Sequence, residues 1–212
     1  MASNNVLRWK DGRGWLILSG DANSDIRAQA LWRVSADGGV AYLGEQREQI
    51  LDDMEDLGAP AGYLVDVMAE DDETVEAKIA DAGMVVIGGD TSASEARSGL
   101  MGAAARGMQA AFGNGAVVLA EGQSAAAFGT WVAAASGELP SGLDWLESVL
   151  VLPGVTSLAE SDLARSALSK DPSVIVIGIG AGSALALGPD GEVETWGDKQ
   201  VAIALGSNYG GG

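Results

Sequence analysis

The feature that most constrains the fold of this chain is a regular alternation of short apolar runs with longer segments of helical periodicity. The first apolar run is Trp15-Leu16-Ile17-Leu18, and similar runs recur along the first half of the chain. Strands that alternate with helices in this way form a parallel sheet covered by helices. We expect strands at residues 15–18, 40–43, 63–67, 84–87 and 116–120.

The segments between these runs predict helices. We expect helices at about residues 24–34, where the Ser24 hydroxyl can cap the helix, and at 46–57 and 70–81. Residues 92–112 form a longer helical segment rich in alanine, although its glycines weaken the expectation of an unbroken helix. A further alanine-rich helix is expected from residue 123 to about 135.

The last third of the chain predicts a change in architecture. Gly188-Pro189-Asp190-Gly191 is a turn sequence between two apolar runs, which indicates a β-hairpin. We also expect strands at 148–152, 174–177 and 201–205, and a helix at 160–169. The chain shows no repeat and no linker. It therefore predicts one α/β domain over residues 1–212, a three-layer sandwich with a mostly parallel central sheet and a C-terminal hairpin.

The charge of the chain limits its partners. With 30 acidic and 12 basic side chains the formal charge is −18, which repels nucleic acid and anionic lipid and attracts cationic ligands. No apolar run approaches the ~20 residues that span a bilayer, and the N-terminus lacks a signal pattern. We therefore expect a cytoplasmic protein with no nucleic-acid or membrane partner.

The chain contains neither cysteine nor histidine. Disulfides and thiolate chemistry are therefore excluded for this sequence, and the usual general base for a serine nucleophile is missing. Histidine is also the commonest nitrogen ligand of metal ions. We expect no metal and no cofactor.

The strongest local signal is Gly122-Gln123-Ser124-Ala125, which lies between an expected strand and an expected helix. A serine on such a tight turn presents its hydroxyl above the sheet edge, beside a helix N-terminus that favours an oxyanion. The alternative is an ordinary serine that caps the helix.

A second signal, Gly88-Gly89-Asp90, follows the expected strand at 84–87. Successive glycines let backbone amides approach a ligand, although a simple turn with Asp90 as a helix cap explains them equally well. In a parallel sheet both glycine-containing loops lie at the same carboxyl edge, where ligands bind in open α/β folds. The sequence thus predicts a site at Gly88, Gly89, Asp90, Gln123, Ser124 and Ala125.

These motifs resemble the serine peptidase family that contains cyanophycinase and dipeptidase E. Ile87-Gly88-Gly89-Asp90 resembles its Gly-Gly-Asp/Asn loop, and Gly122-Gln123-Ser124-Ala125-Ala126-Ala127 resembles its nucleophile string, close to Gly-Thr-Ser-Ala-Gly-Ala. The late stretch of residues 177–187 resembles the entry to its closing strands. The resemblance implies a flavodoxin-like central sheet of the class I glutamine amidotransferase type.

The resemblance also implies roles for individual residues. Ser124 would be the nucleophile, and the N–H groups of Gly89 and Ala125 would form the oxyanion hole. Gly154 stands where the family has its histidine, and Leu152 where it has the preceding aspartate. The family's orienting acid would correspond to Glu138 or Glu147, and other candidate bases are Glu121, Lys170 and Lys199.

The sequence is compatible with three functions. The first is a catalytically degenerate homologue that keeps Ser124 as a vestigial or weak nucleophile and binds a small peptide or cationic ligand. The second is an active hydrolase of aspartyl or arginine-containing peptides that uses a base other than histidine. The third is a structural subunit, and a homodimer is compatible with any of the three. The residues leave open whether the chain is an enzyme.

Overall fold

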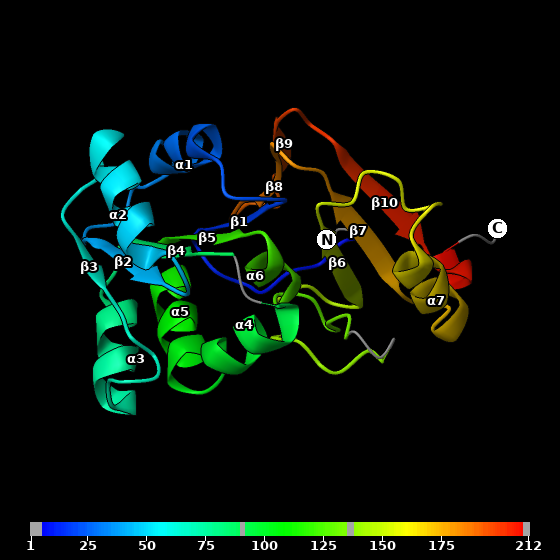
Figure 1. Ribbon diagram of the computed structural model, residues 1–212, viewed down its shortest axis with the longest axis horizontal. Coiled ribbons are helices and arrows are strands. Elements are labelled where there is room, and N and C mark those ends of the chain that lie inside the picture. The colour runs from blue at the N-terminus through cyan, green and yellow to red at the C-terminus, as the bar shows by residue number, and fades with distance from the viewer. Residues whose placement is uncertain (1–5, 90–91, 135–137, 210–212) are drawn as a thin grey trace.

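The computed structural model describes residues 6–89, 92–134 and 138–209, and it confirms the expected α/β fold (Figure 1). A seven-stranded sheet has the order β3-β2-β4-β5-β1-β8-β9. Its first five strands in that order are parallel, β8 runs antiparallel to them, and β9 turns back antiparallel to β8. The strands are β1 Trp15–Ser19, β2 Val40–Leu43, β3 Gly62–Leu64, β4 Met84–Ile87, β5 Val117–Glu121, β8 Ser183–Leu187 and β9 Val193–Gly197.

Helices cover both faces of this sheet, which explains why its inner strands are apolar on both sides. In Figure 1, α1 (Ser24–Leu31) and α2 (Arg47–Asp56) lie on one face. The opposite face carries α3 (Asp72–Ala80), α4 (Ala93–Leu100) and α5 (Ala103–Gly113). Alternate residues of each strand enter different cores. Leu16 and Leu18 pack toward α3–α5, whereas Ile17 packs toward α1 and α2.

The late strands divide between two sheets. The predicted hairpin forms from β8 and β9 and extends the main sheet. In contrast, β6 (Val149–Pro153), β7 (Ile175–Ile179) and β10 (Val201–Leu205) form a separate sheet with the order β10-β7-β6. One face of this small sheet is covered by α7 (Asp162–Lys170), and a short 3₁₀ helix, Ser207–Tyr209, follows β10.

Some expected elements differ in the structure. Residues 92–112 divide into α4 and α5 because Gly102 has φ +72°, outside the helical region. The N-cap of α1 is the Asn23 side chain, which accepts from the Ile26 N–H, and not the Ser24 hydroxyl. The expected strand at 63–67 is confined to β3. None of the described helices is long and apolar enough to cross a membrane.

The expected alanine-rich helix at 123–135 is wrong beyond its first turn. Only α6, Gln123–Ala126, forms. The chain then turns back, and the Ala127 and Gly129 carbonyls accept hydrogen bonds from the N–H groups of Leu143 and Asp144. Long-range backbone pairing therefore replaces the helix that alanine propensity favours.

Candidate functional site

Ser124 lies in the first turn of α6, directly after the tight turn at Gly122 that leads from β5 into this helix. The turn passes through Gly122, whose φ of +53° and ψ of −130° are open to glycine and unfavourable for other residues. The Ala125 N–H donates to the Gly122 carbonyl at 3.0 Å and closes the turn. Because this bond occupies the Ala125 N–H, the proposed oxyanion role of Ala125 would require the turn to open.

The structure brings the second glycine loop against this turn. β4 and β5 are parallel neighbours, and Ile87 lies opposite Ala120 at their carboxyl ends. A Cβ added to Gly89 would lie 2.0 Å from the backbone oxygen of Glu121, so only glycine fits there. The Gln123 N–H donates to the Gly89 carbonyl at 3.1 Å. Asp90, the last member of the predicted loop, lies outside the described residues.

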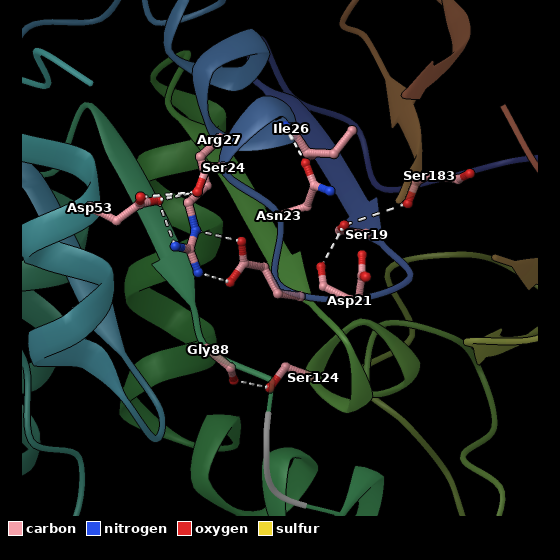
Figure 2. Close-up of polar contacts among 11 residues, drawn as sticks. Ser19, Asp21, Asn23, Ser24, Ile26, Arg27, Asp53, Gly88, Ser124 and Ser183 are labelled. Atoms are coloured by element: carbon pink, nitrogen blue, oxygen red, sulfur yellow. Dashed lines mark hydrogen bonds and ion pairs between the residues drawn. The ribbon is translucent and has the colours of Figure 1, made fainter. Parts of the chain in front are cut away.

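The Ser124 hydroxyl is committed to the backbone. Its Oγ donates to the Gly88 carbonyl oxygen at 2.6 Å, as Figure 2 shows. The residue is 1% exposed. A peptide carbonyl accepts this hydrogen bond but is too weak a base to remove the proton, so the bond holds the hydroxyl without activating it.

A pocket of about 730 Å³ lies over Ser124 at the carboxyl ends of β2, β4 and β5. This is the sheet edge at which ligands bind in open α/β folds. Its apolar wall includes Leu43, Val67, Met68, Ile87 and Leu100. Its ionisable lining residues are Glu45, Arg47, Glu48, Asp66 and Glu95. Of the predicted site residues that the structure describes, Ser124 lines this pocket.

Two of the pocket carboxylates are held in their ionised form. The pKa of Asp66 is lowered, first by a hydrogen bond from the Met68 N–H and also by Arg47, which pairs with Asp66 at 2.7 Å. The pKa of Glu95 is lowered by hydrogen bonds from the Ser92 hydroxyl and the Ser92 N–H, and the second of these belongs to the capping box of α4. Both groups are therefore weak bases.

Glu121, one of the candidate bases, points away from Ser124. It lies on the same strand face as Val117 and Leu119, which is covered by α1 and α2. There it is fully buried, and it accepts hydrogen bonds from Arg27 at 2.8 Å (Nε–Oε1) and 2.7 Å (Nη2–Oε2). Figure 2 shows Arg27 directed toward Asp53, apart from the Ser124–Gly88 contact.

Burial and charge oppose each other in this pair. Burial raises the pKa of Glu121, and the Arg27 guanidinium counteracts that rise. Burial acts to lower the pKa of Arg27, but Glu121 and Asp53 outweigh it and leave that pKa raised. Arg27 therefore stays charged, and Glu121 serves as its structural partner.

The other candidate bases also lie away from the pocket in the described part of the chain. Glu147 is exposed and lies 3.6 Å from Arg8, and Lys199 is in the turn between β9 and β10. Gly154, which resemblance places at the histidine position, is in a turn after β6 with φ +75°. None of these residues lines the pocket, and neither do Glu138 and Lys170.

Sequence reasoning missed most of the pocket. Arg47, Glu48 and Glu95 belong to charged helix surfaces, where the sequence gives no sign of a shared cavity. Asp66 gave the clearest signal, because it is a lone carboxylate within the apolar run of residues 63–67. Among the described residues, no group of three or more Asp or Glu side chains is placed to hold a metal ion.

Comparison with solved structures identifies this architecture in known peptidases. A peptidase from an acI-B1 actinobacterium is 16% identical, with a TM-score of 0.69 over 92% of this chain and 96% of that one. A putative peptidase E protein from Listeria monocytogenes EGD-e is 13% identical, with a TM-score of 0.65 over 87% of this chain and 98% of that one. No protein family and no curated protein matches the sequence. The chain therefore has the fold of peptidase E-like proteins.

Proposed function

We propose that this protein is a catalytically degenerate relative of the peptidase E-like enzymes that binds a small cationic ligand in the pocket over Ser124. The observation that carries the proposal is the hydrogen bond from Ser124 Oγ to the Gly88 carbonyl. An active serine hydrolase directs this proton to a base. Here the proton is directed to the backbone, and the sequence contains no histidine.

Three described carboxylates around the Ser124 turn, Asp66, Glu95 and Glu121, are poorly suited to replace that base. Asp66 and Glu95 have lowered pKa values because other groups already donate to them. Both carboxylate oxygens of Glu121 already accept hydrogen bonds from Arg27, one from Nε and one from Nη2. Losing the base of a serine triad costs several orders of magnitude in rate, so a binding role is more consistent with this site than turnover.

The pocket indicates the chemical class of the ligand. Its volume lies within the range of about 300–1,000 Å³ that is typical of small-molecule sites. Among the described lining residues four side chains are carboxylic acids, and the guanidinium of Arg47 is already paired with Asp66. The surplus negative charge beside an apolar wall favours a ligand with a positive group and an apolar part, such as a short peptide with a basic side chain.

The first test is hydrolysis. Wild-type protein and Ser124→Ala are assayed with a β-aspartyl-arginine dipeptide and a panel of aspartyl dipeptides. We expect equal background rates for the two proteins. Turnover by the wild type that disappears in Ser124→Ala would refute the degenerate reading and favour the alternative, an active serine hydrolase with a base other than histidine.

The second test is binding, measured by calorimetry with arginine-containing dipeptides and their citrulline counterparts, which lack the charge. We expect the arginine peptides to bind more tightly. Glu48→Gln should weaken their binding about two- to fivefold, because a partly exposed charge contact contributes about 0.5–1 kcal/mol. Glu160→Gln is the matched control, since Glu160 is exposed outside the pocket. Equal binding of both peptide sets would contradict the proposed ligand class.

A further inference from the structure

The small sheet ends in an open apolar strand. β10 is the edge of the order β10-β7-β6, and its sequence is Val-Ala-Ile-Ala-Leu. Ile203 is 51% exposed and Leu205 is 46% exposed. Within the described part of the chain, no strand pairs with the outer side of β10. An uncharged edge strand of this kind is a template for another strand.

The hydrogen-bond pattern shows which backbone groups of β10 are unpaired. Beyond the two ends of β10, the Gly180 N–H donates to the Gln200 carbonyl and the Gly206 N–H donates to the Val174 carbonyl, both at 2.8 Å. These pairs continue the antiparallel register of β10 with β7. In such a ladder every second residue bonds to the neighbouring strand, so the even-numbered residues of β10 face β7.

The odd-numbered residues therefore direct their N–H and C=O groups to the open side. These residues are Val201, Ile203 and Leu205, and Ile203 is the centre of the five-residue strand. A second β10 in antiparallel orientation would place Ile203 opposite its own counterpart and Val201 opposite Leu205. Each of these pairs is of the hydrogen-bonded type, so the strand is complementary to itself in both backbone and side chains.

The other edge strands of the two sheets are protected against pairing with a further strand. β9 carries Glu194 on the edge of the main sheet, and β3 is only three residues long. β6, the other edge of the small sheet, is joined to Trp131 by a bridge at Leu150. Charge, shortness and coverage are the devices by which proteins block edge association. Within the part of the chain that the structure describes, β10 has none of these three protections.

We propose that β10 pairs antiparallel with β10 of a second copy of this chain, about a two-fold axis at Ile203. The two small sheets then join into one sheet of six strands. A second copy is favoured over another occupant because a self-complementary strand produces a closed, isologous pair. The charge also permits it. The chain carries −18 overall, yet residues 199–209 contain no acidic side chain that would repel the same segment of the partner.

Sedimentation velocity over a concentration series tests this pairing. We expect a reversible monomer–dimer equilibrium for the wild type. Ile203→Lys and Ile203→Glu each place like charges at the two-fold axis and should weaken dimerisation about tenfold or more. Val193→Lys is the matched control, because Val193 is 51% exposed on the edge strand β9 and should leave the dimer unchanged.

A mixture of the two variants separates the interface from a folding defect. Opposite charges then meet at the axis, so Ile203→Lys mixed with Ile203→Glu should restore a dimer that neither variant forms alone. A wild type that stays monomeric at every concentration overturns the proposal. A dimer that survives in both single variants, or that the mixture fails to restore, also overturns it.

Discussion

The buried pair of Arg27 and Glu121 gives the sharpest prediction about stability. Its carboxylate is fully buried, and the Arg27 side chain is 9% exposed. Arg27→Met keeps much of the side-chain volume but leaves Glu121 charged and without its counter-ion. Removing one partner of a buried pair costs about 3–5 kcal/mol. At about 2–4 °C per kcal/mol for a chain of this size, the melting temperature should fall by about 6–20 °C.

A double-mutant cycle separates the pair from the rest of the network. Glu121→Gln should cost less than Arg27→Met, because Arg27 still contacts Asp53 at 2.7 Å. The double variant should be more stable than the sum of the two losses predicts, since neither charge then lacks a partner. Urea unfolding followed by circular dichroism gives each free energy of unfolding.

The pH dependence of the free energy of unfolding tests whether the unpaired charge of Glu121 causes the loss of stability. In Arg27→Met, the pKa of Glu121 should rise further above its unfolded value, so the folded state binds the proton more tightly. The deficit in stability is then largest at neutral pH and shrinks as the pH falls through the pKa of folded Glu121. Arg106→Met is the control, because the Arg106–Glu76 pair is exposed and should contribute under about 1 kcal/mol. If Arg27→Met costs no more than this control at neutral pH, the reasoning is refuted.

Further predictions concern the loop at Gly89 and the loss of stability at low pH. Gly89→Ala should destabilise the protein by about 1–3 kcal/mol in urea unfolding, because its Cβ would lie 2.0 Å from a backbone oxygen of β5. Gly113→Ala, at the open end of α5, should be neutral or slightly stabilising, and an equal loss in both variants would contradict the role of close packing. The pKa of Glu70 is lowered by the Asp66 N–H and by Lys78, so its contribution to stability is present above its ordinary value of 4.5 and lost as the pH falls through its folded pKa. Glu70→Gln should therefore flatten the loss of stability in acid, and an unchanged acid profile would count against this account.

The parts of the fold that were predictable from sequence are those fixed by local patterns. The buried strand Val40–Leu43 reads as an apolar run because helices cover both of its faces. The hairpin of β8 and β9 follows from its Pro-Asp-Gly turn. The separate sheet of β6, β7 and β10 was not predictable, because an apolar run does not specify which distant strand it joins. The short α6 was also missed, since long-range backbone pairing overrides alanine propensity.

The candidate site also has parts that the sequence predicts and parts that it does not. The meeting of the Gly88 and Gly122 loops follows from parallel order, because adjacent strands end at one edge. The pocket lining does not follow, because its charged residues come from the loop after β2, from α2 and α4, and from the loop after β3. The orientation of Glu121, in contrast, can be predicted from the sequence. Glu121 shares its strand parity with Val117 and Leu119, which directs it to the face opposite the pocket.

The serine turn itself shows why a motif string cannot establish catalysis. Glycine is required at position 89 because a Cβ there would lie 2.0 Å from the backbone oxygen of Glu121. Glycine is required at position 122 because φ is positive there. Both requirements come from packing parallel strands and a helix closely, and they persist whether or not Ser124 reacts. Selection for the fold alone would therefore preserve most of the string that resembles a nucleophile turn. What distinguishes a catalytic turn is the acceptor of the serine proton, and here that acceptor is the Gly88 carbonyl.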